Sequence, residues 1–126
     1  MTRINTVPVE ELTTKHLVAE FRELPRIAAY IRKSNYSNEG APDKYTLGKG
    51  HVKYFYNKLL FLLNRYDSLF FEGLRRGYQF KYRCDWIQAL INSPTPPHFW
   101  QHWQPDEEAI ELNRQRIQDR LNGKKD

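Results

Sequence analysis

Apolar residues recur at steps of four and three in the first third of the chain, and this spacing predicts a helix over residues 9–33 with one buried face. The residues on that face are Leu17, Phe21, Leu24, Ala28 and Ile31. Pro25 lies inside the pattern, where it removes a backbone hydrogen bond and crowds the preceding turn. We therefore expect either a kink at Pro25 or two shorter helices that meet there. Residues 2–8 have no helical period, which predicts an extended arm.

A second apolar segment predicts a long central helix over residues 51–76. Its buried face would consist of Val52, Phe55, Leu59, Leu62, Tyr66 and Leu69. Gly77 follows two arginines and is typical of a helix end. The preceding residues 34–50 are rich in Ser, Asn, Gly and Pro, which predicts a loop. Residues 78–104 alternate only weakly and contain the run PTPP, so we expect irregular chain there.

A third helix is predicted over residues 105–121, with Pro105 in its first turn. Acidic residues at its start and arginines near its end have the order that the helix dipole favours. Taken together, the pattern predicts an all-α fold. We expect a single compact domain, residues 1–126, with three main helices, long irregular connections and a frayed tail over 122–126.

Composition adds a preference for an anionic partner. The 126 residues carry a formal net charge of +5, and nucleic acid is the commonest partner of a soluble basic domain. One cysteine excludes an internal disulfide. No stretch approaches the roughly 20 apolar residues that span a bilayer, and the N-terminus does not resemble a secretory signal. We expect a cytoplasmic, nucleoid-associated protein that does not bind membranes.

The N-terminal segment holds two features that packing alone does not explain. Thr2 is small enough that the initiator methionine would normally be removed, which would leave a free α-amine beside the cationic Arg3. Glu23 lies between Arg22 and Arg26 and is close to a proline. An amine nucleophile and a positioned carboxylate are the minimum equipment for Schiff-base chemistry. Thr2 and Glu23 are therefore candidate catalytic residues.

Two further motifs have both a functional and a structural interpretation. Gly48, Lys49 and Gly50 precede the predicted central helix and could present backbone amides and a cation to a phosphate, or they could form a flexible turn. Arg116 and Arg120 are four apart and would project from one side of the third helix. They could hold adjacent phosphates, or they could belong to a solvated helix face.

The stretch 75–86 interleaves basic and aromatic residues. This composition suits a nucleic-acid face, but charged side chains around a packed aromatic cluster would give the same pattern. His98 and His102 are four apart, yet no Cys, Asp or Glu accompanies them at ligand spacing. We therefore predict no metal site. The sequence also points to no cofactor.

The chain resembles the phage endonuclease V family of pyrimidine-dimer DNA glycosylases, which also have AP lyase activity. The resemblance lies in MTRIN at residues 1–5, EFRELPR at 20–26, LGKGHVKYFYNKLLFL at 47–62, LRRGY at 74–78, and the segment around Ala109–Arg120. Several matching segments in the same order along the chain identify a family more specifically than any one motif does.

The resemblance implies a reaction at the N-terminus. The α-amine of Thr2 would attack the sugar C1′ of the damaged nucleotide, displace the base and form an imine, and Glu23 would assist β-elimination. A terminal amine has an ordinary pKa near 7.7–8.0. Arg3, Arg22 and Arg26 would lower the pKa of that amine by like-charge repulsion. The same arginines would hold phosphates that flank the lesion.

The resemblance also implies a partner, damaged double-stranded DNA, which would be kinked with a base flipped out. Further DNA contacts fall on His16, Gly48, Gly50, His51, Arg116 and Arg120. We expect the protein to act as a monomer. Two other functions are compatible with the residues: a non-catalytic protein that binds damaged or intact duplex DNA, and a glycosylase for other damaged bases.

Overall fold

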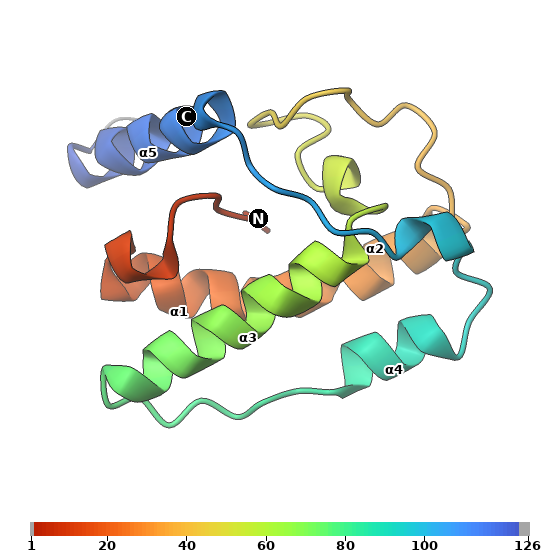
Figure 1. Ribbon diagram of the computed structural model, residues 1–126, viewed down its shortest axis with the longest axis horizontal. Coiled ribbons are helices and arrows are strands. Elements are labelled where there is room, and N and C mark those ends of the chain that lie inside the picture. Colours follow the sequence, from red (N-terminus) through yellow and green to blue (C-terminus); the bar gives the residue numbers. More distant parts are fainter. Residues whose placement is uncertain (1, 124–126) are drawn as a thin grey trace.

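The computed structural model describes residues 2–123, and its secondary structure in this range consists of helices, without strands (Figure 1). The helices are α1 (Thr14–Glu23), α2 (Ile27–Lys33), α3 (Leu59–Arg75), α4 (Asp85–Ile91) and α5 (Glu107–Leu121). Single 3₁₀ turns cover Val9–Glu11, Leu24–Arg26, Lys53–Phe55 and Pro97–Phe99. The predicted all-α class is confirmed. Of the tail predicted to be frayed, residues 124–126 lie outside the described range.

The first predicted helix, over 9–33, is divided into shorter elements. Thr13 caps α1, because its side chain accepts a hydrogen bond from the His16 amide. The helix therefore begins at Thr14, and the prediction of helix from residue 9 is wrong. Pro25 lies in the 3₁₀ turn that joins α1 to α2. The expected break at Pro25 is confirmed, in the form of two shorter helices that meet there.

The predicted helix over 51–76 is wrong in its first part, since α3 begins only at Leu59. The backbone of Lys58 is not helical, with φ −129° and ψ 44°. The apolar spacing in the sequence does not show where the helix is interrupted. Phe55 and Leu59 are both fully buried, although they belong to different elements.

A distant segment caps the start of α3. The amides of Leu60 and Phe61, which have no partner within the helix, donate hydrogen bonds to the carbonyl of Gln101 at 3.2 and 3.3 Å. The helix start thus depends on a contact with a residue far along the chain. Local sequence does not record such a contact.

The expectation of irregular chain over 78–104 is wrong at α4. Trp86 and Leu90 are one turn apart on this helix, and both are buried. A helix of two turns contains too few apolar positions to give a clear period. At the start of α5, Asp106 is the N-cap and accepts from the Ala109 amide at 2.8 Å. Pro105 therefore precedes the cap, and the prediction that it lies in the first turn is wrong.

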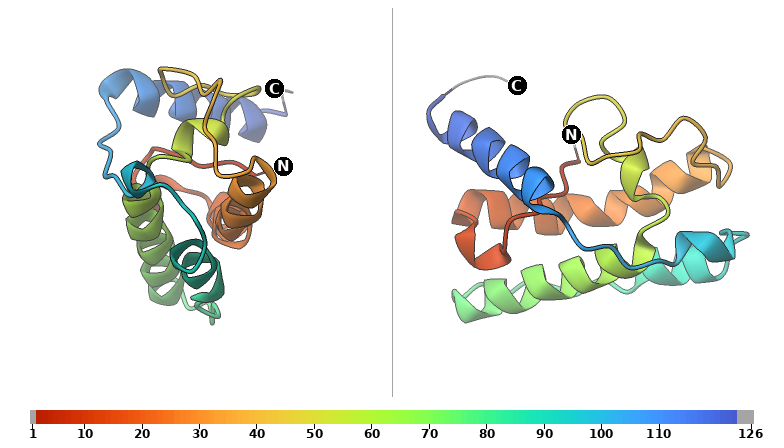
Figure 2. Two further views of the ribbon diagram at one scale, coloured as in Figure 1. Left: turned by 90° about the vertical axis from the view of Figure 1, so that its right-hand side faces the viewer. Right: turned by 45° about the horizontal axis from the view of Figure 1, so that its top comes forward.

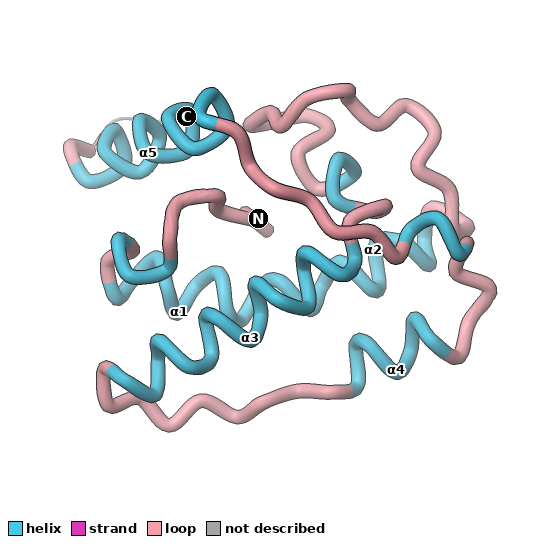
Figure 3. The backbone as a smooth tube through the Cα atoms, viewed as in Figure 1, coloured by secondary structure: helices cyan, strands magenta, loops and turns pink. Residues whose placement is uncertain are grey.

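Helices α1, α2, α3 and α4 form a layer, and the N-terminal arm and α5 lie on one side of this layer (Figure 2). Helix α1 packs against α3, and α4 packs against α2. Long connections without helix wrap around this layer (Figure 3). The Phe21 ring is stacked between the rings of Tyr66 and Phe80, with centroid distances of 4.7 and 4.2 Å. Among residues 2–123, no helix is both long enough and apolar enough to cross a membrane.

Candidate active site

The N-terminal arm is extended, as predicted, and it is also buried. Every residue from Thr2 to Val7 is at most 8 % exposed. The arm runs between α5 on one side and α1 and α3 on the other (Figure 1). An extended segment has no internal hydrogen bonds, so its buried amides and carbonyls need partners elsewhere in the protein. These partners come from α3, from α5 and from the loop that contains Tyr45 and His51.

A chain of buried polar side chains holds the middle of the arm. Asn113 of α5 accepts hydrogen bonds from the Thr6 and Val7 amides at 2.8 and 3.2 Å. Its amide nitrogen donates to the Oδ1 of Asn5 at 2.7 Å. Asn5 in turn donates to Glu20 of α1 at 2.8 Å. The arm is therefore tied to α1 and α5 at adjacent residues.

Helix α3 contributes to the same network through Arg65. Its guanidinium donates to both carboxylate oxygens of Glu20, at 2.8 and 3.0 Å, and its Nη1 donates to the Val7 carbonyl at 2.7 Å. Both side chains are buried. Because each partner satisfies the other and also bonds to the arm, this ion pair fixes the arm between α1 and α3.

His51 and Tyr45 hold the arm closer to its start. The Ile4 amide donates to Nε2 of His51 at 2.9 Å, so that nitrogen carries no proton. The proton is then on Nδ1, which donates to the Thr46 carbonyl at 2.8 Å. Burial lowers the pKa of His51 to about 4, although the hydrogen bond to the Thr46 carbonyl by itself raises this pKa. Tyr45 donates to the Ile4 carbonyl at 3.0 Å, and burial raises the pKa of Tyr45, which keeps this donor protonated.

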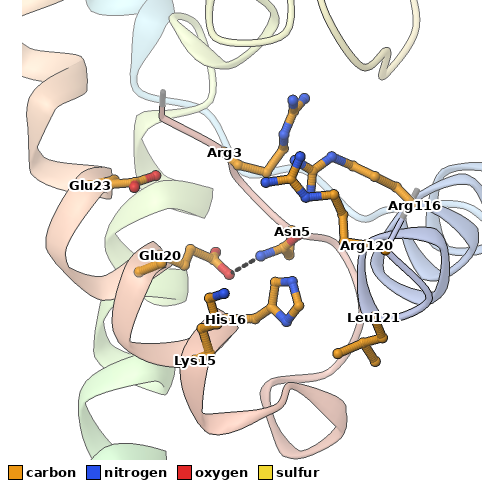
Figure 4. Close-up of a pocket in the computed structure, with 11 residues that line it drawn as sticks. Arg3, Asn5, Lys15, His16, Glu20, Glu23, Arg116, Arg120 and Leu121 are labelled. Carbon is orange, nitrogen blue, oxygen red and sulfur yellow. Dashed lines mark hydrogen bonds between the residues drawn. The ribbon is translucent and has the colours of Figure 1, made fainter. Parts of the chain in front are cut away.

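A cleft of about 430 Å³ opens between the arm, α1 and α5 (Figure 4). Its polar lining consists of Arg3, Asn5, Lys15, His16, Glu20, Glu23, Arg116 and Arg120. The structure therefore brings together Arg3, His16, Glu23, Arg116 and Arg120, five of the site residues that the sequence analysis predicted. The guanidinium groups of Arg116 and Arg120 point from α5 towards Arg3 of the arm.

Cations dominate the electrostatics of this cleft. The pKa of His16 is lowered, first by burial and then by the positive charges of Arg116, Lys15 and Arg120. A half-buried imidazole surrounded in this way is neutral at physiological pH. The carboxylate of Glu20 is already bonded to Arg65 and Asn5. The cleft is suited to an anionic ligand with regularly spaced charges, such as a nucleic-acid backbone.

Glu23 and Arg3 line the same cleft, and Thr2 directly precedes Arg3 in the arm. Glu23 is half-buried in the cleft, and its side chain extends from α1 towards the arm (Figure 4). The hydroxyl groups of Thr2 and Tyr30 are 3.4 Å apart. Tyr30 belongs to α2, which follows α1 after the 3₁₀ turn. The arm thus brings Thr2 to α2, the helix that follows the one carrying Glu23.

Thr2 lines a second cleft, of about 380 Å³, together with Gly48, Lys49, Gly50 and His51. The two glycines have φ of +81° and +87°, a conformation that side chains rarely adopt. Glycine at these two positions therefore shapes the turn beside Thr2. His51 is 2 % exposed and bonded at both ring nitrogens, so the geometry favours a role in holding the arm over direct DNA contact.

The other predicted groups are dispersed. Arg22 and Arg26 are exposed and do not line the cleft. In the basic and aromatic stretch, Arg83 pairs with Asp85 and Trp86 is buried, which favours packing over a nucleic-acid face there. Within residues 2–123, no group of three or more His, Cys, Asp or Glu is arranged to hold a metal ion.

The buried polar network was not predicted from the sequence, although two of its members occupy positions that indicate burial. Asn113 lies four residues from both Ala109 and Ile117, inside the apolar stripe of α5. Glu20 likewise lies beside Leu17 on the buried face of α1. A polar residue within an apolar stripe indicates a buried hydrogen-bond partner. Nothing in the sequence identifies which residue that partner is.

A family model described as pyrimidine dimer DNA glycosylase matches residues 1–86 of the 126. The matched segment includes the arm, α1, α2, the Gly48–Gly50 turn and α3. It ends before α5, which supplies Asn113, Arg116 and Arg120 to the site.

Proposed function

Because the chain belongs to the pyrimidine dimer DNA glycosylase family, whose substrate is DNA, we propose that it combines base excision with AP lyase activity through an imine at Thr2. The observation that carries the proposal is the fixed arm, in which Thr2 directly precedes Arg3, and Arg3 lines the same cationic cleft as Glu23. Removal of Met1 would convert the Thr2 nitrogen into an α-amine. A terminal amine has a substantial neutral fraction near pH 8, unlike a lysine side chain.

The proposed chemistry has two stages. The neutral Thr2 amine attacks C1′ of the damaged nucleotide, the glycosidic bond breaks, and the base leaves with the bonding electron pair. Ring opening and loss of the amine proton give an imine between Thr2 and C1′. A proton acceptor then removes the C2′ proton, a C2′–C3′ double bond forms, and the 3′ phosphate leaves. Glu23 is the carboxylate placed to assist the proton transfers.

The cationic residues would hold the DNA during this reaction. Arg3, Arg116 and Arg120 line the cleft and would contact phosphates next to the lesion, and His16 would contribute a neutral hydrogen-bonding group. Arg22 and Arg26, exposed outside the cleft, would contact phosphates further along the strand. Gly48 and Gly50 would present backbone amides beside Thr2.

Borohydride reduction of the imine tests the proposal. The purified protein is first weighed by mass spectrometry to establish whether Met1 is absent, and it is then mixed with an abasic or dimer-containing duplex and sodium borohydride. We expect a covalent protein–DNA complex that maps to the Thr2 nitrogen. A version that retains Met1 is the matched control and should form no such adduct.

Two outcomes would contradict the proposal. Base excision without a trapped complex would indicate a glycosylase that uses water as the nucleophile and lacks the lyase step. DNA binding with equal affinity for damaged and intact duplex, and no excision, would indicate a non-catalytic protein. Product analysis on duplexes with dimers or oxidised purines defines which lesion is removed.

A further inference from the structure

We propose that Asn113 of α5 is a positioning residue for the reaction, because it sets where the arm presents Thr2. This inference rests on the proposed role of Thr2 as the nucleophile. Asn113 is fully buried and contacts three consecutive residues of the arm, Asn5, Thr6 and Val7. It lies beyond residue 86, where the family match ends.

The bonding capacity of Asn113 is directed at the arm. Its carbonyl oxygen accepts from two successive backbone amides, at 2.8 and 3.2 Å, and its nitrogen donates to Asn5 at 2.7 Å. Thr6 adds a bond from its hydroxyl to the Ala109 carbonyl, one turn earlier on α5. The arm can therefore neither slide along α5 nor rotate about its own axis without breaking several of these bonds.

The Asn113 contacts also extend to the helix that carries Glu23. Asn5 connects Asn113 to Glu20, and Glu20 is bonded to Arg65 of α3. Glu20 precedes Glu23 by three residues, which places the two on neighbouring positions of α1. Asn113 thus fixes the arm relative to the helix that supplies the proposed acid–base group. Small errors in the geometry of reacting groups carry large rate penalties, about 100-fold for a displacement of about 1 Å.

A purely structural role for Asn113 predicts a different result. In that case its replacement would lower the stability of the whole protein, and activity would fall only as the folded fraction falls. A positioning role predicts slow imine formation in protein that is fully folded. Leu90 provides the control, because it is buried on α4 and lies away from the arm. Leu90→Ala should therefore destabilise the fold without removing a contact to the arm.

The experiment compares wild type, Asn113→Ala and Leu90→Ala at a temperature where circular dichroism shows all three to be folded. The measurements are the single-turnover rate of borohydride trapping on an abasic duplex, the affinity for a duplex with a non-reactive abasic analogue, and amide hydrogen exchange by NMR. If Asn113→Ala does not fold, Asn113→Ser, which keeps a small acceptor, takes its place under the same criteria.

We expect Asn113→Ala to slow trapping about 10- to 100-fold and to change DNA affinity by less than about threefold, since Asn113 is buried and does not line the cleft. Exchange of the Thr6 and Val7 amides should accelerate more than exchange in α3. Leu90→Ala should trap at nearly the wild-type rate and accelerate exchange without singling out the arm.

A trapping rate within about twofold of wild type would overturn the positioning role, and so would a loss equal to that of Leu90→Ala at matched stability. Wild-type protein that traps nothing would instead refute Thr2 as the nucleophile, and the positioning role with it. The exchange data separate the cases, because local acceleration at Thr6 and Val7 reports the contact between Asn113 and the arm whether or not the protein is active.

Discussion

Glu20 and Arg65 form a buried ion pair in which two nitrogens of the guanidinium bond to two oxygens of the carboxylate, at 2.8 and 3.0 Å. The pair joins α1 to α3, and each member also bonds to the arm, Glu20 through Asn5 and Arg65 through the Val7 carbonyl. The arm is thus held by charges that are buried between the helices. This arrangement makes the arm dependent on the pair.

Arg65→Met should lower the free energy of unfolding by about 3–5 kcal/mol, because Glu20 would keep its burial and lose its counter-charge. Urea denaturation measures the change. The double variant Arg65→Met/Glu20→Leu removes both charges and should be more stable than Arg65→Met alone. A single variant as stable as wild type would show that the pair is not buried as described.

Glu23→Gln should leave stability and DNA affinity close to wild type and reduce strand cleavage by at least about 100-fold, in line with the usual effect of an acid–base group. Cleavage of an abasic duplex under single-turnover conditions measures this. Glu20→Gln is the matched control on the same helix. It should destabilise the protein, because the buried Arg65 would then face a neutral amide in place of a carboxylate. Normal cleavage by Glu23→Gln would show that Glu23 has no role in strand cleavage.

The cationic cleft should dominate the salt dependence of DNA binding. Arg116→Ala and Arg120→Ala should each reduce the slope of log affinity against log salt concentration by about 1, because each removes one phosphate contact. Fluorescence anisotropy between low and moderate salt measures the slope. Arg114→Ala is the control, since Arg114 is on the same helix but does not line the cleft. Equal slopes for Arg114→Ala and Arg116→Ala would contradict binding in the cleft.

Stability should rise with pH over the interval in which His51 is charged only in the unfolded chain. The pKa of His51 falls from 6.5 to about 4 on folding, so between these values the unfolded state binds more protons. The free energy of unfolding should therefore increase from about pH 4 to about pH 6.5, by up to about 3 kcal/mol from this group, and then level off.

His51→Phe isolates this contribution, because the variant has no titratable group at this position. Its unfolding free energy should depend less steeply on pH over the same interval, although the loss of the bond to the Ile4 amide lowers its stability at every pH. His16, whose pKa is also lowered, contributes with the same sign in both proteins and cancels in the comparison. Parallel pH profiles would show that folding does not lower the pKa of His51.

The sequence by itself determined the helical class, the extended arm and the break at Pro25, since each follows from local rules. Apolar spacing records which face of a helix is buried, and proline records where a backbone bond is lost. The sequence also pointed to Thr2 and Glu23 as two chemically unusual residues of the N-terminal segment. It placed the start of the central helix wrongly, because the residue that caps this helix, Gln101, lies far along the chain.

Only the tertiary structure decided that the arm is buried and what holds it. Asn113, Glu20 and Arg65 come from three helices, and each appears in the sequence as one polar residue among many. Their pairing results from the cost of burying an unsatisfied polar group, and this cost arises only when the helices and the arm pack together. The same packing brings Arg3, Arg116 and Arg120 into one cleft, which neither end of the chain could form alone.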